Sequence, residues 1–113
     1  MPYMDIRSSK PIDGPTKNKL QLEIGKIMPI IPGKEVSNTL FCFLDSYTMY
    51  KEKEQVDAVF VDVRMYQVSP LEAKREFVKA VTPILADTLN ISPGHIHLNF
   101  IEQDNWGVGG DFL

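Results

Sequence analysis

The sequence predicts a single α+β domain, in which a duplicated βαβ unit forms a four-stranded mixed sheet with two helices on one face. Segments with strand and helix patterns follow one another in the order βαβ, βαβ along 113 residues, a length typical of one domain. Each predicted helix begins with a proline, and each helix-to-strand turn carries Pro-Gly followed by a basic residue, at positions 32–34 and 93–95. Strands that a helix joins are expected to run parallel, with right-handed crossovers.

These shared features indicate a weak internal duplication. We predict one domain over residues 1–113, with pseudo-repeats over 3–45 and 58–101 and a C-terminal tail over 102–113.

The first half opens with a strand over residues 3–8, where Met4 and Ile6 share one face. The segment IDGPTKNKLQLEIGKIMPII predicts a helix, because Pro15 suits a first turn and Pro29 ends the pattern. Its apolar side is expected to consist of Leu20, Leu22, Ile24, Ile27 and Met28. The run NTLFCFLD has the length and the aromatic content of a strand.

The second half repeats this order after a charged connection, SYTMYKEKEQ. The alternating run AVFVDVRMY predicts a strand, and SPLEAKREFVKAVTPILADTL predicts a helix that contains Pro83. We expect Ser69 to cap this helix, Pro70 to take its first position and Glu72 to complete a capping box. HIHLNFI is the fourth strand, and DNWGVGGDFL is a glycine-rich tail.

One face of the predicted sheet is polar, because charged and amide side chains alternate with apolar ones in three of the four strands. They are Asp5, Arg7, Asp62, Arg64, His95, His97 and Asn99. Such a face is either solvated or covered by other copies of the chain, with Asp and Arg pairing across the contact. The second strand is apolar on both sides, which favours a homo-oligomer.

Composition argues against several classes of partner and cofactor. The net charge of −3 gives no electrostatic reason to expect nucleic acid or a membrane surface as a partner. The single cysteine, Cys42, excludes a disulfide within the chain and favours a reduced, cytoplasmic setting. No apolar stretch has the length of a membrane span, and no signal-peptide layout is present. Two histidines and one cysteine make a metal site improbable, and no nucleotide-binding fingerprint predicts a cofactor.

Several motifs together resemble the tautomerase superfamily. They are the leading Met1-Pro2, the duplicated βαβ, a lysine before the second strand and the pattern LxISPxxIxxN in LNISPGHIHLN. The branch of macrophage migration inhibitory factor and D-dopachrome tautomerase is the most similar, while DAVFVDVRMY also resembles a strand of 5-carboxymethyl-2-hydroxymuconate isomerase. The resemblance implies a homotrimer whose sheets enclose a central barrel.

The resemblance also implies a catalytic role for Pro2. Members of this superfamily lose the initiator methionine, so that proline becomes the N-terminus and its secondary amine acts as a base. An α-amino group titrates at about pH 8, and an apolar pocket or a nearby cation lowers its pKa. The free amine can take a proton from an enol oxygen or an α-carbon and return it elsewhere. Once Met1 is removed, we therefore expect a cofactor-free keto–enol tautomerase for small 2-oxo acids such as phenylpyruvate.

Other site residues follow from the resemblance, position by position. Lys34 would grip the substrate carboxylate, although a solvated turn lysine is the alternative. Asn99 of a neighbouring subunit, with His97 where the cytokine-type members have tyrosine, would polarise the carbonyl oxygen; the alternative is that His97 pairs with Asp62 or another acid. The remaining lining residues would be Met65, Tyr3, Val108 and Phe112.

Two other functions stay open at this point. One is a trimeric, cytokine-like binding or signalling protein with a vestigial pocket, and the other is an isomerase of the 5-carboxymethyl-2-hydroxymuconate type. Branches of the superfamily that dehalogenate or decarboxylate use extra arginines near the proline. Strand parity places Arg7 and Arg64 on the inter-subunit face, so we expect tautomerisation rather than dehalogenation or decarboxylation.

Overall fold

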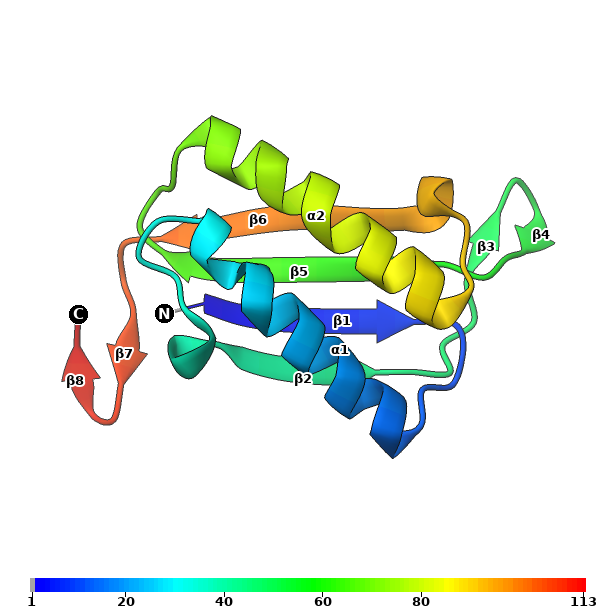
Figure 1. Ribbon diagram of the computed structural model, residues 1–113, viewed down its shortest axis with the longest axis horizontal. Coiled ribbons are helices and arrows are strands. Elements are labelled where there is room, and N and C mark those ends of the chain that lie inside the picture. The colour runs from blue at the N-terminus through cyan, green and yellow to red at the C-terminus, as the bar shows by residue number, and fades with distance from the viewer. Residues whose placement is uncertain (1) are drawn as a thin grey trace.

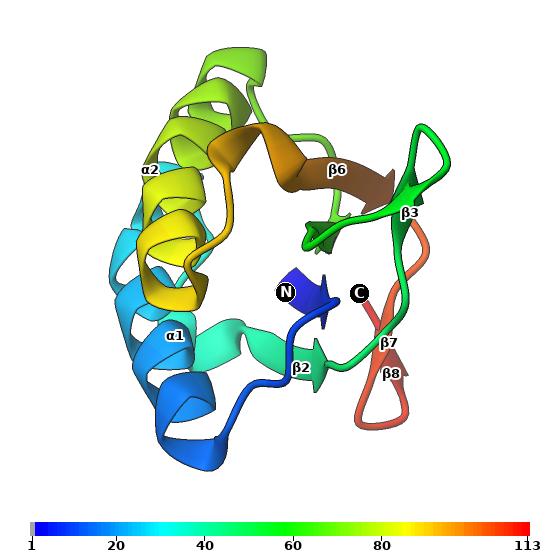
Figure 2. The same ribbon diagram turned by 90° about the vertical axis from the view of Figure 1, so that its right-hand side faces the viewer.

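The computed structural model describes residues 2–113, and Met1, whose removal we predict, lies outside the described residues. Its sheet has the strand order β2-β1-β5-β6, and both helices cover one face (Figures 1 and 2). The strands are β1 (Pro2–Ser8), β2 (Leu40–Leu44), β5 (Val59–Tyr66) and β6 (Ile96–Gln103), and the helices are α1 (Gly14–Ile27) and α2 (Leu71–Leu89).

Strand direction follows the predicted βαβ pattern. β1 pairs parallel with β2, and β5 pairs parallel with β6, so each helix connects two parallel neighbours. The two halves meet through β1 and β5, which pair antiparallel with Pro2 opposite Met65. The predicted fold class, a mixed four-stranded sheet with two helices on one face, is confirmed.

Shorter elements, which were not predicted, complete the fold. The charged connection forms the hairpin of β3 (Tyr50–Lys51) and β4 (Glu54–Gln55), and the tail forms that of β7 (Gly107–Val108) and β8 (Asp111–Phe112). Figures 1 and 2 show these hairpins beyond opposite ends of the sheet, on the side away from the helices. Three short 3-10 turns are η1 (Met28–Ile30), η2 (Val36–Asn38) and η3 (Pro93–His95).

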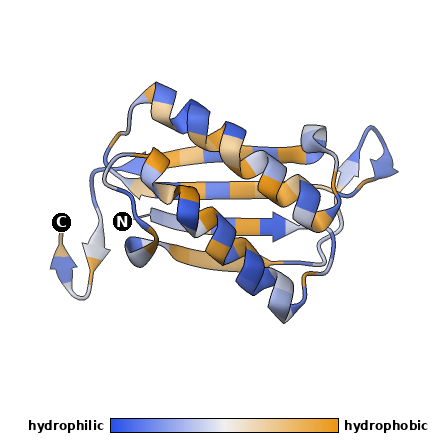
Figure 3. Ribbon diagram, viewed as in Figure 1, coloured by the Kyte–Doolittle hydropathy of each residue, from blue (hydrophilic) through white to orange (hydrophobic). Residues whose placement is uncertain are grey.

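The core lies between the sheet and the helices. Alternate residues of β1 and β5 point toward the helices and are fully buried, as the two-residue period of a strand requires. The same alternation of apolar and polar residues is visible along the strands in Figure 3. The largest of the fully buried side chains are Phe77, Met4, Ile6, Leu20, Ile24, Met28, Ile31, Met65 and Leu85.

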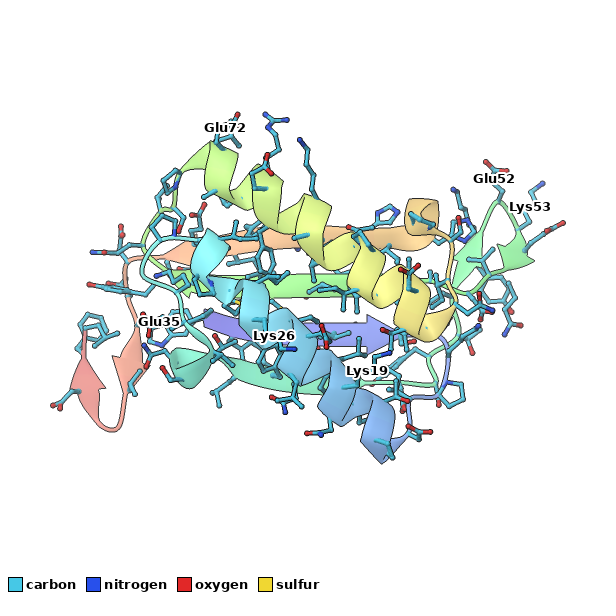
Figure 4. All side chains as sticks on the ribbon, in the orientation of Figure 1. Lys19, Lys26, Glu35, Glu52, Lys53 and Glu72 are labelled. Carbon is cyan, nitrogen blue, oxygen red and sulfur yellow. The ribbon has the colours of Figure 1, made fainter. Side chains whose placement is uncertain are left out.

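Leu22 does not join this core, contrary to the prediction, because 52% of it is exposed. Leu20 and Ile24 are four residues apart and share the buried face of α1, whereas Leu22 stands about 200° around the helix from Leu20. Figure 4 shows Lys19 and Lys26 on the outer side of the same helix.

The predicted capping box of α2 is wrong. The helix starts one residue later than expected, with Pro70 at the N-cap, and no side chain of the helix start caps it. The Ser69 N–H instead donates to Glu102 Oε2 at 2.6 Å, so the carboxylate comes from β6. Glu72 is paired with Arg75 on the helix surface. α2 continues through Pro83 to Leu89.

The opposite face of the sheet carries a polar row at its centre. Asp5 of β1 stands directly across from Asp62 of β5, which stands beside Asn99 of β6. Asn99 Nδ2 donates to Asp62 Oδ1 at 2.6 Å, so Asn99, not His97, is the partner of Asp62. Asp5 Oδ1 is buried and has no hydrogen-bond partner within residues 2–113.

Candidate functional site

A cavity of about 620 Å³ opens beside Pro2, where β1 begins. This volume is in the range of small-molecule sites. Residues from all four strands of the sheet, from η2 and from the tail line it. They are Pro2, Tyr3, Asn38, Leu40, Arg64, Ile101, Gln103, Trp106, Gly107 and Val108. The cavity therefore combines an apolar wall with an arginine and two amides.

Pro2 is held at the edge of this cavity by the strand that it begins. A proline is tolerated at the first position of a strand because no ladder hydrogen bond is needed from its nitrogen. Pro2 is buried, and its cross-strand partner is Met65. The side chain of Met65 is fully buried in the core on the helix side, and Met65 is not among the described residues that line the cavity.

Lys34 lies in the turn between α1 and β2, behind this edge of the sheet. Gly33 precedes it with a φ of 75°, a conformation that glycine adopts without strain. Lys34 Nζ donates to the Tyr66 carbonyl at 3.0 Å, one residue after Met65. Lys34 is thus near the Pro2 end of β5, but it is not among the described residues that line the cavity.

Glu102 forms a charged cluster at the same end of the sheet. Burial favours its neutral form, but hydrogen bonds from Lys74 and the Ser69 N–H, with the charges of Lys74 and Lys34, lower the pKa of Glu102. The Lys74 Nζ–Glu102 Oε1 distance is 2.7 Å, and both side chains are about 15% exposed. Glu102 is therefore a fixed anion that offsets the positive charge of two lysines.

Tyr3 adds a phenol to the cavity. Its cross-strand partner is Arg64, and both line the same space. Hydrogen bonding with the Cys42 side chain, followed by burial, raises the pKa of Tyr3, while the charge of Arg64 acts in the opposite direction. Tyr3 is therefore a neutral hydrogen-bonding group near neutral pH.

The structure does not bring all the predicted site residues together within one chain. His97 lines a second cavity, of about 440 Å³, with His95, Phe60 and the β3–β4 hairpin. This cavity lies where β5 and β6 begin, whereas the Pro2 cavity lies where they end. Asn99 lies between them, bonded to Asp62. Phe112 belongs to β8 and is 72% exposed.

Arg64 and Gln103 are cavity residues that were not predicted. Parity places Arg64 on the polar face, and the structure agrees, since it is exposed between the buried Val63 and Met65. What parity could not show is that the Pro2 cavity opens on this same face. For Gln103 no local pattern gave a signal, because the predicted strand ended before it.

Residues 2–113 contain neither a cluster of metal ligands nor a helix suited to a membrane. No group of three or more His, Cys, Asp or Glu side chains is placed to hold a metal ion. No helix among these residues has both the length and the apolar character that a membrane crossing requires.

Comparison with known proteins gives both sequence and structural matches. The family model described as "Tautomerase enzyme" matches residues 60–113. The chain is 34% identical over 55 residues to the probable tautomerase K2 of Dickeya dadantii, a match that covers 46% of this chain and 82% of that protein.

Two solved structures are similar over nearly their whole length. For MIF2 of Leishmania major the TM-score is 0.93 at 16% identity, over 100% of this chain and 97% of that one. For the macrophage migration inhibitory factor-like protein of Entamoeba histolytica the TM-score is 0.83 at 23% identity, over 99% and 98%. At these identities the structural matches show the fold alone.

Proposed function

The chain belongs to the tautomerase family, and we propose that it is a cofactor-free keto–enol tautomerase of small 2-oxo acids, with Pro2 as general base. The observation that carries the proposal is the place of Pro2, which is buried at the start of β1 and lines the amphiphilic cavity. Apolar walls with a few polar groups suit a small anion that has an apolar body, such as phenylpyruvate. Within the family, we assign the chain to the branch of macrophage migration inhibitory factor and D-dopachrome tautomerase.

The proposed reaction needs one base that both accepts and returns a proton. Removal of Met1 would free the secondary amine of Pro2, and apolar surroundings make such an amine harder to protonate than it is in water. The amine then takes the enol O–H proton while the C=O bond forms, and a proton returns to the adjacent carbon. The enol becomes the 2-oxo acid, and the amine is regenerated.

The proposed site needs more than one copy of the chain. His97 and Pro2 line cavities at opposite ends of the polar face, so one chain cannot bring them together. In a homotrimer with head-to-tail contacts, the His97 end of one copy would meet the Pro2 end of the next. His97 and Asn99 would then polarise the substrate oxygen, Lys34 would contribute positive charge, and Tyr3, Val108 and Phe112 would complete the pocket.

The test is phenylpyruvate ketonisation by full-length protein whose loss of Met1 has been confirmed by mass spectrometry. Pro2→Gly is expected to lower kcat/KM about 100-fold or more, the range in which general bases act. Protein that retains Met1 should be equally inactive, because an amide nitrogen is not basic. Pro11→Gly, the same change at an exposed proline, is the matched control and should keep full activity.

Equal rates for the Pro2→Gly variant and the parent would contradict the proposal. No activity in any form would favour a trimeric binding protein with a vestigial pocket. Activity confined to hydroxymuconate-type substrates would favour the isomerase of that branch.

A further inference from the structure

We propose that Arg64, rather than Lys34, is the main carboxylate-binding residue of the Pro2 cavity. This inference rests on the proposed function for the substrate class, 2-oxo monocarboxylates with an apolar body. It assigns a specificity-determining role to a residue that strand parity alone had placed on the inter-subunit face and outside the site.

The first argument is position. Arg64 precedes Met65, the cross-strand partner of Pro2, and its own partner is Tyr3. Because successive strand residues point to opposite faces, Met65 is buried under the helices while Arg64 points to the open face. Tyr3 shares this open face with Arg64, and Pro2, at the start of β1, lines the same cavity. An anion held by Arg64 would therefore lie in the cavity that Pro2 lines.

The second argument is the availability of charge. Within residues 2–113, Arg64 forms no ion pair with an acidic side chain. Lys34 is already engaged, since its ammonium donates to the Tyr66 carbonyl at 3.0 Å and its charge acts on the Glu102 carboxylate. Within residues 2–113, an incoming anion would have to compete with these partners at Lys34 but with no acidic side chain at Arg64.

The third argument is chemical fit. A guanidinium presents parallel N–H donors in a plane, which matches the two oxygens of a carboxylate. Leu40, Trp106 and Val108 form apolar parts of the same wall and would contact the body of the ligand. A charge at one side and apolar surface at the other select a monocarboxylate that has an aromatic or aliphatic tail.

The test measures equilibrium binding, so that it does not depend on catalysis. The probe is 3-phenylpropionate, which has the ring and the carboxylate but no oxo group to tautomerise, and its uncharged methyl ester is the second probe. Arg64→Gln in the full-length, Met1-free protein is expected to weaken acid binding about tenfold or more and to leave ester binding unchanged. Arg64→Lys should restore part of the affinity, and Lys34→Gln should weaken acid binding less than Arg64→Gln.

The matched control is Arg7→Gln, on the same face of the sheet but outside the cavity, where Arg7 stacks on Tyr47 with 5.3 Å from its guanidinium carbon to the ring centroid. It should bind both probes like the parent. With phenylpyruvate, Arg64→Gln should raise KM and largely keep kcat, which a general disturbance of the fold would not do.

The inference is overturned if the parent does not bind the acid, if Arg64→Gln affects acid and ester equally, or if Lys34→Gln causes the greater loss. The proposed function fails separately. Parent protein that binds 3-phenylpropionate through Arg64 but does not convert phenylpyruvate would refute the tautomerase activity and keep the anion site.

Discussion

Glu102 shows how one side chain joins three parts of the molecule. It accepts a hydrogen bond from the Ser69 N–H ahead of α2, pairs with Lys74 inside that helix, and feels the charge of Lys34 from the α1–β2 turn. These contacts outweigh the cost of burying its charge and lower its pKa. The Glu102 carboxylate therefore stabilises the fold when it is ionised. The loss of this stabilisation on protonation at low pH should be measurable.

We predict that Glu102→Gln lowers the free energy of unfolding by about 1–3 kcal/mol at neutral pH. The folded pKa of Glu102 lies below the ordinary value of 4.5, so the unfolded chain binds the proton more readily. The contribution is thus complete above about pH 4.5 and is lost as the pH falls through the lower, folded value. Denaturant unfolding of both proteins between pH 7 and pH 3 checks this, since the difference between them should shrink on acidification.

The control for this prediction is Glu72→Gln. Glu72 is on the surface of α2, with a side chain that is 76% exposed, and such ion pairs contribute little. A difference between wild type and Glu102→Gln that stayed constant down to pH 3 would contradict the argument.

The ends of the helices illustrate the element scale, because one start is capped locally and the other is not. At α1, Asp13 Oδ1 accepts from the Thr16 N–H at 2.8 Å, and this bond lowers the pKa of Asp13. At α2 no side chain within residues 2–113 caps the helix start. The nearest carboxylate bond is the one that Glu102 accepts from the Ser69 N–H, just before the N-cap Pro70, and Glu102 is 33 residues from Ser69 in the chain. Lys10 binds the C-terminal end of α2, where its Nζ donates to the carbonyls of Leu89 and Asn90, each at 3.1 Å.

We predict that Lys10→Met destabilises the protein by about 1–2 kcal/mol. Methionine keeps the apolar stem but removes two hydrogen bonds and a positive charge from the C-terminal carbonyls of α2. Lys19→Met, at an exposed position of α1 visible in Figure 4, is the matched control and should change stability by less than about 0.5 kcal/mol. Equal unfolding midpoints in urea for the two variants would contradict the role of Lys10.

At the scale of the whole molecule, the polar face of the sheet is incomplete in a single chain. Asp5 and Asp62 stand directly opposite each other, and like charges at such positions destabilise a sheet. Asn99 compensates Asp62, whereas Asp5 Oδ1 has no partner among the described residues. This imbalance, with cavities at opposite ends of the face, supports the proposed trimer.

We predict that two inactive variants complement each other. Pro2→Gly lacks the base, and a double variant of His97→Ala and Asn99→Ala lacks the proposed contribution from a neighbouring copy. After the two chains are unfolded and refolded together in equal amounts, about a quarter of the sites should combine an intact Pro2 with intact partner residues, because each of the two positions is intact in half of the copies. Activity that stayed at the level of the separate variants would show that the site is not shared.

The pattern of apolar residues was sufficient to predict the sheet, both helices and their common face, because burial follows the period of each element and needs only local information. The N-terminal proline and the segment before β6 were likewise sufficient to indicate the family. Parity, however, gives the face of a strand residue and not its neighbours across the sheet. That Arg64 and Pro2 line one cavity, and that Glu102 binds the Ser69 N–H ahead of α2, depend on register and on contacts between distant segments, which only the packed chain specifies.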